Sequence, residues 1–541
     1  MRRRPLILTL GFVVVAMLGY WLARTAAPRA VSRGENPRSQ IEIGPQWRVI
    51  ADEPAPRFRK EVRSPASRRD DEAIKSGALP GQRVLVFKDK SALEAFLKRA
   101  GDKVRLMGRL DALNALRIGF SDPDVLASLL AGDEESSLVF PVDVPPAPGD
   151  GTAQPGAVAL GAGLLEWLGI TGDNTAWGSG VRVAVLDTGV TSSRAFTSAI
   201  TFQNLVGLPA NLSTQSGHGT AVASMIIGRD SLTPGVAPSA DIISIRIAND
   251  AGQSDSFLLA QGIVAAVDAG AGLINISMAS FGDSVLVRNA IEYARAAGAL
   301  IIAAAGNNGL NQLSYPAAND GVIAVGAVDA MGNHLDFSNT GSQLALSAPG
   351  FGINAAWIGD QAASVSGTSF SAPIVAGAIA AVKSWPGNEN LTLRQAANLL
   401  ISYLNDGGAA GPDYALGGGT PDLGRVLNAK NPGIYDAALA SQRILPPDSK
   451  NPYGQVEIMV QNRGTENLIN TRVRISTPTG DVTSNITSLA VNAVKTIRVP
   501  ISQPTAASMH YGSQVILSQG RTDAKPSNDR RVETYVPAGG K

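Results

Sequence analysis

Between residues 160 and 430, short apolar runs alternate with stretches of helical periodicity, and this alternation constrains the fold more than any other feature. Continuously apolar strands separated by helices are typical of a parallel sheet covered on both faces. The sequence therefore predicts an α/β domain over 160–432, with ligands at the carboxyl ends of its strands. The expected strands are 181–187, 241–247, 272–278, 299–306 and 322–328, and the expected helices are 218–228, 256–269 and 284–297.

A chain of 541 residues is expected to hold more than one domain. Residues 80–146 follow the order strand, helix, strands, helix, strand, which predicts a small α+β domain. In it, Ser91 and Glu94 predict a capping box, and 138–144 a last strand. Residues 147–159 are rich in proline and glycine and predict a linker, and alternating runs over 445–541 predict a small β-sandwich.

The N-terminus begins with MRRR, followed by the uncharged apolar stretch 5–23. This pattern predicts an export signal within residues 1–27, either a retained membrane anchor or a cleaved signal peptide. Both alternatives place the body of the protein outside the cytoplasmic membrane. Residues 28–79 mix charges with prolines and lack apolar periodicity, so they predict a disordered tether.

Composition excludes several classes of function. With no cysteine, the chain has no disulfides, thiolate metal sites or cysteine nucleophile. Its 46 basic and 45 acidic residues give no electrostatic reason to expect a nucleic-acid partner. The three histidines, His218, His334 and His510, form no HExxH zinc motif.

Asp187 ends the first apolar run, in RVAVLDTGV, so its carboxylate is expected at the mouth of the cleft. A turn or helix-capping aspartate is the alternative interpretation. Aspartic proteases also place Asp-Thr-Gly after an apolar strand, but they need two such carboxylates to share a proton. The chain has no second Asp-Thr-Gly or Asp-Ser-Gly, which argues against that class.

Three further segments present polar groups toward the same cleft. His218 lies between glycines in GHGTAVASMIIG at the expected start of a helix, and Asn307 follows an apolar strand in AAAGNNG. Four hydroxyl residues crowd SGTSFSAPIVAG, where Pro373 is expected in the first turn of a helix. A structural histidine, an Asn-Gly turn and a plain helix cap are the alternatives, although one cap explains only one hydroxyl.

In chain order, Asp187, His218, Asn307 and Ser369 resemble the catalytic set of the subtilisin-like serine proteases, the subtilases. The resemblance covers residues 160–430, about half of the chain. It is supported by the further segments GVAPSADI, VIAVGAVD and DFSNTGSQLALSAPG.

The resemblance implies a role for each of these positions. Ser369 would be the nucleophile, His218 its general base and Asp187 the group that orients the imidazole. Asn307 would stabilise the oxyanion together with the backbone N–H of Ser369. An extended peptide substrate would then lie along two edges of the cleft, at Ser277, Met278, Ala279 and Gly306.

The sequence also departs from the family pattern. Ala279 and Ser280 stand where the family often has glycines, which predicts a narrower substrate channel. The loop 228–235 is shorter than the loop that holds calcium in secreted relatives. We therefore expect no cofactor and assign no residue to calcium, although the family is compatible with it.

Residues 80–146 resemble the inhibitory propeptide of the same family in the order of their elements, an unrelated accessory domain being the alternative. A propeptide would inhibit the enzyme from within, place its C-terminal end in the active site and be cut somewhere in 141–160. The last hundred residues resemble adhesion-type immunoglobulin-like modules. The expected function is an exported serine endopeptidase acting on proteins or peptides and made as a self-processed precursor. A catalytically silent scaffold or a surface adhesion protein is the alternative.

Overall fold

The computed structural model describes residues 64–132, 134–145, 154–198, 200–207, 216–445, 447–501, 509–518 and 520–535. The expected export signal and most of the expected tether lie outside these residues. Within the described ranges, no helix is both long enough and apolar enough to cross a membrane.

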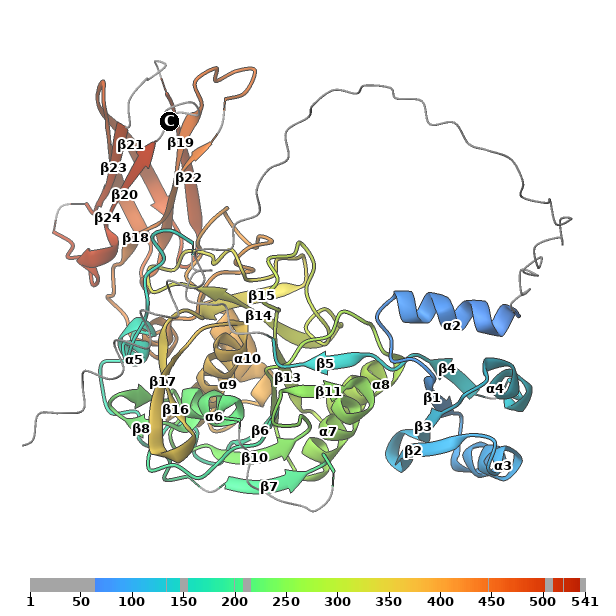
Figure 1. The fold of residues 1–541 in the computed structure, drawn as a ribbon. Helices are drawn as coiled ribbons and strands as arrows, with labels where there is room; N and C mark the ends of the chain where they lie inside the picture. The colour runs from blue at the N-terminus through green and yellow to red at the C-terminus, as the bar shows by residue number, and fades with distance from the viewer. Residues whose placement is uncertain are drawn as a thin grey trace, which may run out of the picture. The chain divides into compact units, whose positions relative to one another are not determined.

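A seven-stranded parallel sheet forms the centre of the α/β domain (Figure 1). All five strands expected from apolar runs are present. The sequence missed the two edge strands, because one is largely exposed and the other is built of small residues. In spatial order the strands are β15 (Leu344–Pro349), β14 (Val322–Val328), β13 (Leu300–Ala304), β12 (Leu273–Ile276), β6 (Arg182–Asp187), β10 (Asp241–Arg246) and β7 (Ile200–Asn204).

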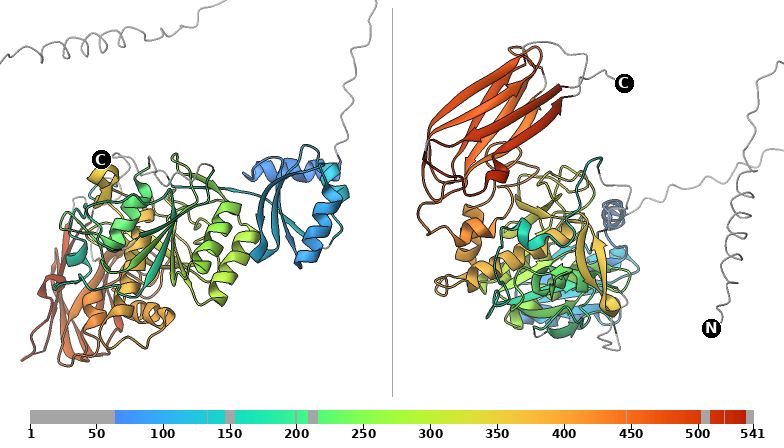
Figure 2. Two further views of the ribbon diagram at one scale, coloured as in Figure 1. Left: turned by 90° about the horizontal axis from the view of Figure 1, so that it is seen from below. Right: turned by 90° about the vertical axis from the view of Figure 1, so that its left-hand side faces the viewer.

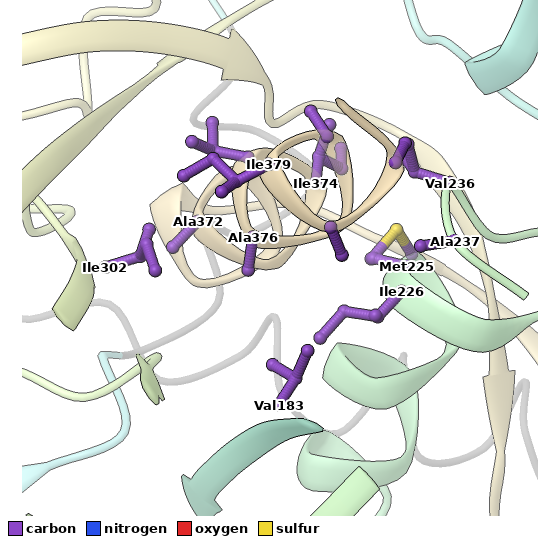
Figure 3. Close-up of a cluster of buried hydrophobic side chains, with 14 of the residues drawn as sticks. Val183, Met225, Ile226, Val236, Ala237, Ile302, Ala372, Ile374, Ala376 and Ile379 are labelled. Carbon is purple, nitrogen blue, oxygen red and sulfur yellow. The ribbon is translucent and has the colours of Figure 1, made fainter. Parts of the chain in front are cut away.

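Helices cover both faces of this sheet because alternate residues of each strand point to opposite sides. Val183 and Val185 pack with α6 (His218–Ile227), α9 (Thr368–Ser384) and α10 (Leu393–Ser402). Ala184 and Leu186 pack with α7 (Ser256–Asp268) and α8 (Val285–Ala296). Figure 3 shows Ile374 and Ile379 of α9 in one cluster with Ile226 of α6 and Val183 of β6. Helices α6 and α9 are thus fixed in one core.

The N-terminal domain has a four-stranded sheet in the order β2-β3-β1-β4, with two helices on one face (Figure 2). Its other face packs on α7 and α8 through Val84, Leu110 and Ala115. Its elements are β1 (Gln82–Phe87), α3 (Lys90–Ala100), β2 (Arg105–Leu110), β3 (Ala115–Gly119), α4 (Pro123–Leu129) and β4 (Glu134–Ser137). The expected α+β order is present.

Three local expectations for this domain differ from the structure. Of the expected strand 138–144, only β5 (Pro141–Asp143) forms, and it pairs with β11 of the α/β domain, whereas the last strand of the N-terminal sheet is the earlier β4. Helix α3 begins two residues earlier than expected, because Asp89 rather than Ser91 caps it and accepts from Ala92 N–H at 2.8 Å. The end of the expected tether forms α2 (Pro65–Lys75), which Ser64 caps and whose Ala73 is buried.

The C-terminal region contains two antiparallel sheets that share one apolar core, as expected for a β-sandwich (Figure 2). One sheet is β18 (Ala437–Leu445), β19 (Gln455–Asn462) and β22 (Val494–Pro500). The other is β21 (Gly480–Leu489), β20 (Leu468–Thr477), β23 (Met509–Ile516) and β24 (Arg530–Tyr535). Strands β18 and β21 were not expected from the sequence.

Short elements complete the described chain. They are α5 (Leu164–Trp167), β8 (Arg229–Asp230), β9 (Thr233–Pro234), β11 (Gln253–Asp255), β16 (Ile353–Trp357), β17 (Gln361–Val365), α11 (Leu423–Leu427) and three 3₁₀ turns at 111–113, 358–360 and 526–528.

Candidate active site

Asp187 and His218 meet at the carboxyl end of the central sheet. Asp187 is the last residue of β6 and is fully buried, and His218 is the first residue of α6. The Nδ1 atom of His218 lies 2.8 Å from Oδ1 and 3.0 Å from Oδ2 of Asp187. Thr188 N–H also donates to this carboxylate, at 2.7 Å. The carboxylate therefore holds the imidazole by Nδ1, which leaves Nε2 for chemistry.

Gly219 makes this close pairing sterically feasible. A Cβ at position 219 would lie 2.4 Å from the carbonyl oxygen of Gly189 and 3.2 Å from Oδ1 of Asp187. The N–H of Gly219 also donates to Thr188 Oγ1 at 3.2 Å. The glycine after the histidine is thus required by the approach of two backbone segments.

Ser369 lies in the first turn of α9, on the same cavity as His218. The cavity measures about 530 Å³, and Trp357, Ser366 and Phe370 also line it. The hydroxyl of Ser369 donates to the carbonyl oxygen of Ser277 at 3.2 Å. Within the described chain no hydrogen bond joins it to His218, so the structure brings the two residues together without an engaged Ser–His pair.

Pro373 is not in the first turn of α9, as the sequence had suggested, because the helix already begins at Thr368. A residue at this place would normally donate its N–H to the carbonyl of Ser369, four residues earlier, and proline has none. That carbonyl instead accepts the hydroxyl of Ser277 at 2.6 Å. The proline therefore leaves a hydrogen-bonding position open beside the candidate nucleophile, and Ser277 fills it.

Asn307 is held so that its amide nitrogen faces the backbone at the start of α9. Its Oδ1 accepts from Thr368 N–H at 2.9 Å and from Thr368 Oγ1 at 2.8 Å. Its Nδ2 lies near Gly367, where a Cβ would approach it to 2.8 Å. The N–H of Ser369 belongs to the first helical turn, whose N–H groups have no acceptor within the helix. The two expected oxyanion donors therefore lie at the same helix start.

The four expected substrate-binding residues have different surroundings. Ser277 uses its side chain and carbonyl on Ser369, as described, and the side chain of Met278 is fully buried in the core. Gly306 donates its N–H to Thr368 Oγ1 and accepts from Asn339 N–H, which holds the loop before Asn307. Ala279 pairs with Asp143 through both its backbone N–H and its carbonyl.

Strand β5 of the N-terminal domain occupies this edge of the cleft. It pairs antiparallel with β11 on one side, and Asp143 exchanges two hydrogen bonds of 2.9 Å with Ala279 on the other. Val144 N–H then donates to the carbonyl of Gly252 at 2.8 Å. Val142 and Pro145 are buried, whereas Asp143 is exposed. The chain thus carries an added strand between two edges of its own cleft.

Sequence reasoning missed several of these site residues. It did not identify the edge formed by Gly252 and β11, because QSD has no strand pattern of its own. It also missed two supporting hydrogen bonds, from the hydroxyl of Thr188 to Asp187 and from the hydroxyl of Thr368 to Asn307. Two other hydroxyls of the serine cluster have partners outside the catalytic set. The hydroxyl of Ser366 accepts from the N–H of Gly352, and that of Ser371 donates to the carbonyls of Ala348 and Pro349.

Neither of the other histidines approaches this site. His334 is half-buried, and the loss of solvent around it lowers its pKa, whereas His510 contacts Thr534 in the sandwich. Residues 229–234 form the short hairpin β8–β9 in place of a long loop. Among the described residues, no group of three or more histidine or acidic side chains is placed to hold a metal ion. The expectation of no cofactor, with no residue assigned to calcium, stays a prediction.

Comparisons with known proteins agree with this architecture. The model of the subtilase family matches residues 178–419. The thermostable alkaline protease of Halalkalibacterium halodurans is 38% identical over 231 residues, which span 42% of this chain and 64% of that protein. Subtilisin Savinase of Lederbergia lenta is 37% identical over 226 residues, or 40% of this chain and 81% of the relative.

A solved structure shares the fold. The epidermin leader peptide processing serine protease of Staphylococcus aureus aligns with a TM-score of 0.54 and 19% identity, over 65% of this chain and 98% of that one. From the fold, the site and these similarities together, the chain belongs to the subtilase family.

Proposed function

We propose that the protein is a serine endopeptidase that hydrolyses peptide bonds through an acyl-enzyme at Ser369. The observation that supports this most is that His218, which is hydrogen-bonded to the buried Asp187, lines the same cavity as Ser369. A buried carboxylate that orients an imidazole beside a serine at a helix start has the parts that acyl transfer needs.

The reaction requires a small movement of the Ser369 hydroxyl. It turns from the carbonyl of Ser277 to Nε2 of His218, which takes its proton while Oγ bonds to the substrate carbonyl carbon. His218 then gives that proton to the leaving amine as the carbon–nitrogen bond breaks, and water hydrolyses the ester by the same route in reverse. Asp187 keeps Nδ1 protonated and stabilises the imidazolium throughout.

Asn307 and the start of α9 stabilise the negative oxygen of the tetrahedral intermediate. Thr368 occupies the amide oxygen of Asn307 with two donors, so the amide nitrogen is the end left to donate. Losing one such donor typically costs about 3 kcal/mol of transition-state stabilisation.

Protein or peptide substrates would bind as an extended strand between β11 and the Ser277–Ala279 edge, where β5 lies in this structure. Main-chain hydrogen bonds supply affinity in this mode and side-chain pockets supply selectivity. The exported location, the membrane anchor or signal, and the role of residues 80–146 as an inhibitory propeptide belong to the same proposal. They are supported by the N-terminal sequence and by the position of β5.

Substituting the nucleophile tests the proposal. The wild-type chain, freed of its N-terminal domain by a site-specific cut, should hydrolyse members of a peptide library. Ser369→Ala should lower kcat/KM by at least about 10⁴-fold. Ser371→Ala is the matched control, because its hydroxyl lies in the same turn but bonds only to Ala348 and Pro349, and it should keep most activity. Equal activity of Ser369→Ala and wild type would contradict the proposal, and an inactive wild type would favour the silent scaffold.

A further inference from the structure

The register of β5 determines which peptide bond the N-terminal domain presents to Ser369. Asp143 is the partner of Ala279 in an antiparallel ladder. In an antiparallel pair, two residues forward on one strand correspond to two residues back on the other, so position 145 faces position 277. Pro145 is buried and lines the cavity that contains His218 and Ser369. The bond after Pro145 is therefore the one delivered to the candidate nucleophile.

Pro145 fills this position without making its ladder hydrogen bond. A residue opposite Ser277 would donate its N–H to the carbonyl of Ser277, and proline has no N–H. That carbonyl accepts the hydroxyl of Ser369 instead, at 3.2 Å. In the occupied cleft the hydroxyl of Ser369 thus donates to the carbonyl of Ser277 and not to His218.

The next residue in the sequence is also a proline, Pro146. Cleavage here would form the bond from Ser369 Oγ to the carbonyl carbon of Pro145 and break the bond from that carbon to the nitrogen of Pro146. The proton of Ser369 would have to pass through His218 to the ring nitrogen of Pro146. That nitrogen stays bonded to two carbon atoms of its own ring when the peptide bond breaks. The ring crowds that nitrogen, and a proline after Pro145 also restricts the backbone of Pro145 to extended conformations.

We propose that residues 141–145 are a built-in inhibitor that binds as a substrate strand but is not cut by Ser369 at the bond that follows Pro145. Removal of the N-terminal domain then needs hydrolysis of a different bond. This inference rests on the proposed endopeptidase function, and it removes the bond between positions 145 and 146 from the expected range of cleavage, 141–160.

The inhibitor is held by contacts that do not depend on the scissile bond. β5 has strand neighbours on both edges, and Val142 is fully buried among core residues such as Phe257. The domain is also tied to the same region by the ion pair between Arg117 and Asp255, at 2.7 Å. Tight binding without cleavage is the expected result when the strand is well held but the reacting atoms are misplaced, since small misplacements cost ~100-fold in rate.

Processing of the full chain tests the inference. Wild type, Pro145→Ala/Pro146→Ala and the control Pro148→Ala are purified and incubated, and new N-termini are identified by sequencing and intact mass. We expect a new N-terminus at position 146 only in the double variant, at least ~100-fold faster than in wild type or the control. Adding Ser369→Ala to the double variant should abolish it. A Ser369-dependent cut between 145 and 146 in wild type would overturn the inference.

Synthetic peptides provide a second measurement that requires no folding of a variant. A peptide with the sequence of residues 139–149 should inhibit the cut enzyme competitively and stay intact, whereas the same peptide with alanine at both proline positions should be hydrolysed. Hydrolysis of the natural peptide between its two prolines, or equal resistance of both peptides, would overturn the inference.

Failure of the proposed function gives a different result. Residues 147–152 are replaced by the recognition sequence of an added site-specific protease, and the cut enzyme is assayed on unrelated peptides. If the cut enzyme is active on these peptides and also cuts between positions 145 and 146, the proposed function stands and the inference is wrong. An enzyme inactive on every peptide after the cut loses the proposed function itself.

Discussion

The α/β domain contacts its two neighbours in contrasting ways. At the N-terminal interface, formed by β5, β11, Ala279 and the Arg117–Asp255 pair, backbone hydrogen bonds place a strand in the cleft. At the C-terminal interface, formed by Arg425, Arg463, Asp406 and Gln461, buried charged and amide side chains bond to backbone groups.

This difference indicates which of the two neighbouring domains can dissociate from the α/β domain. A substrate strand can replace β5, because any extended peptide offers the same main-chain groups. No peptide can replace Arg425, which donates to the carbonyls of Tyr403, Leu404 and Arg463 and reaches Asn492 at 2.6 Å. The N-terminal interface suits a removable inhibitor, and the C-terminal one a permanent attachment.

The largest expected effect is at the C-terminal interface. Arg425→Ala would leave several buried carbonyls without donors, and we expect the free energy of unfolding to fall by about 3–5 kcal/mol. Chemical denaturation measures it. Arg394→Ala, at an exposed helical position, is the control and should change stability by less than about 0.5 kcal/mol. An equally small effect at Arg425 would contradict the permanence of this interface.

The N-terminal interface should depend on Arg117. Its side chain is 13% exposed and that of Asp255 is 9% exposed, so the pair is largely desolvated. Arg117→Ala should weaken binding of the cut N-terminal domain by about 30-fold or more, or at least ~2 kcal/mol, as measured by calorimetry. Arg109→Ala provides the control, because its partners Glu94 and Asp111 belong to the same domain. Equal affinities of the Arg117→Ala and Arg109→Ala domains would show that the ion pair with Asp255 does not contribute to binding.

A double-mutant cycle probes the contact beside the nucleophile. Ser277→Ala should cost about 1–3 kcal/mol, because it leaves the carbonyl of Ser369 buried without a donor. Adding Pro373→Ala restores a backbone N–H four residues after Ser369 and should recover part of that loss. Thermal unfolding of the four proteins gives the coupling energy. Strictly additive effects would show that the two donors do not compete for one carbonyl.

The smallest expected effect is a pH dependence at the C-terminal interface. Burial raises the pKa of Asp406 to about 6, with the charge of Asp413 adding to the effect. The folded protein therefore binds a proton more tightly than the unfolded chain, so stability is lost as pH rises from about 4 to about 6. Asp406→Asn should flatten this part of the profile of melting temperature against pH. An unchanged slope would assign it to other groups.

The sequence predicted the parts of the fold that local patterns encode. Long apolar runs identified the inner strands, and glycine-flanked or strand-terminal positions drew attention to Asp187, His218 and Asn307. Ser369 was selected from its hydroxyl cluster only by the resemblance to the subtilases, and the catalytic roles of all four residues stay predictions. Edge strands such as β7 were missed because an exposed strand has no apolar pattern.

What the sequence could not predict depends on contacts between distant segments. The first turn of α9 was placed too late because Pro373 looked like a helix start, and only the hydroxyl of Ser277, 92 residues away, satisfies the carbonyl that proline leaves open. The pairing of β5 with Ala279 and the burial of Arg425 likewise arise from tertiary packing. Neither has a local signature.

Reaction of Ser369 with a fluorophosphonate probe tests most directly whether a catalytic serine lies beneath the N-terminal strand. The probe is added to the chain with the inserted protease site, before the cut and after removal of the freed domain, and the labelled residue is identified by mass spectrometry. We predict labelling of Ser369 that is at least ~100-fold faster after removal. Equal rates before and after removal, or no labelling of Ser369 in the cut chain, would contradict it.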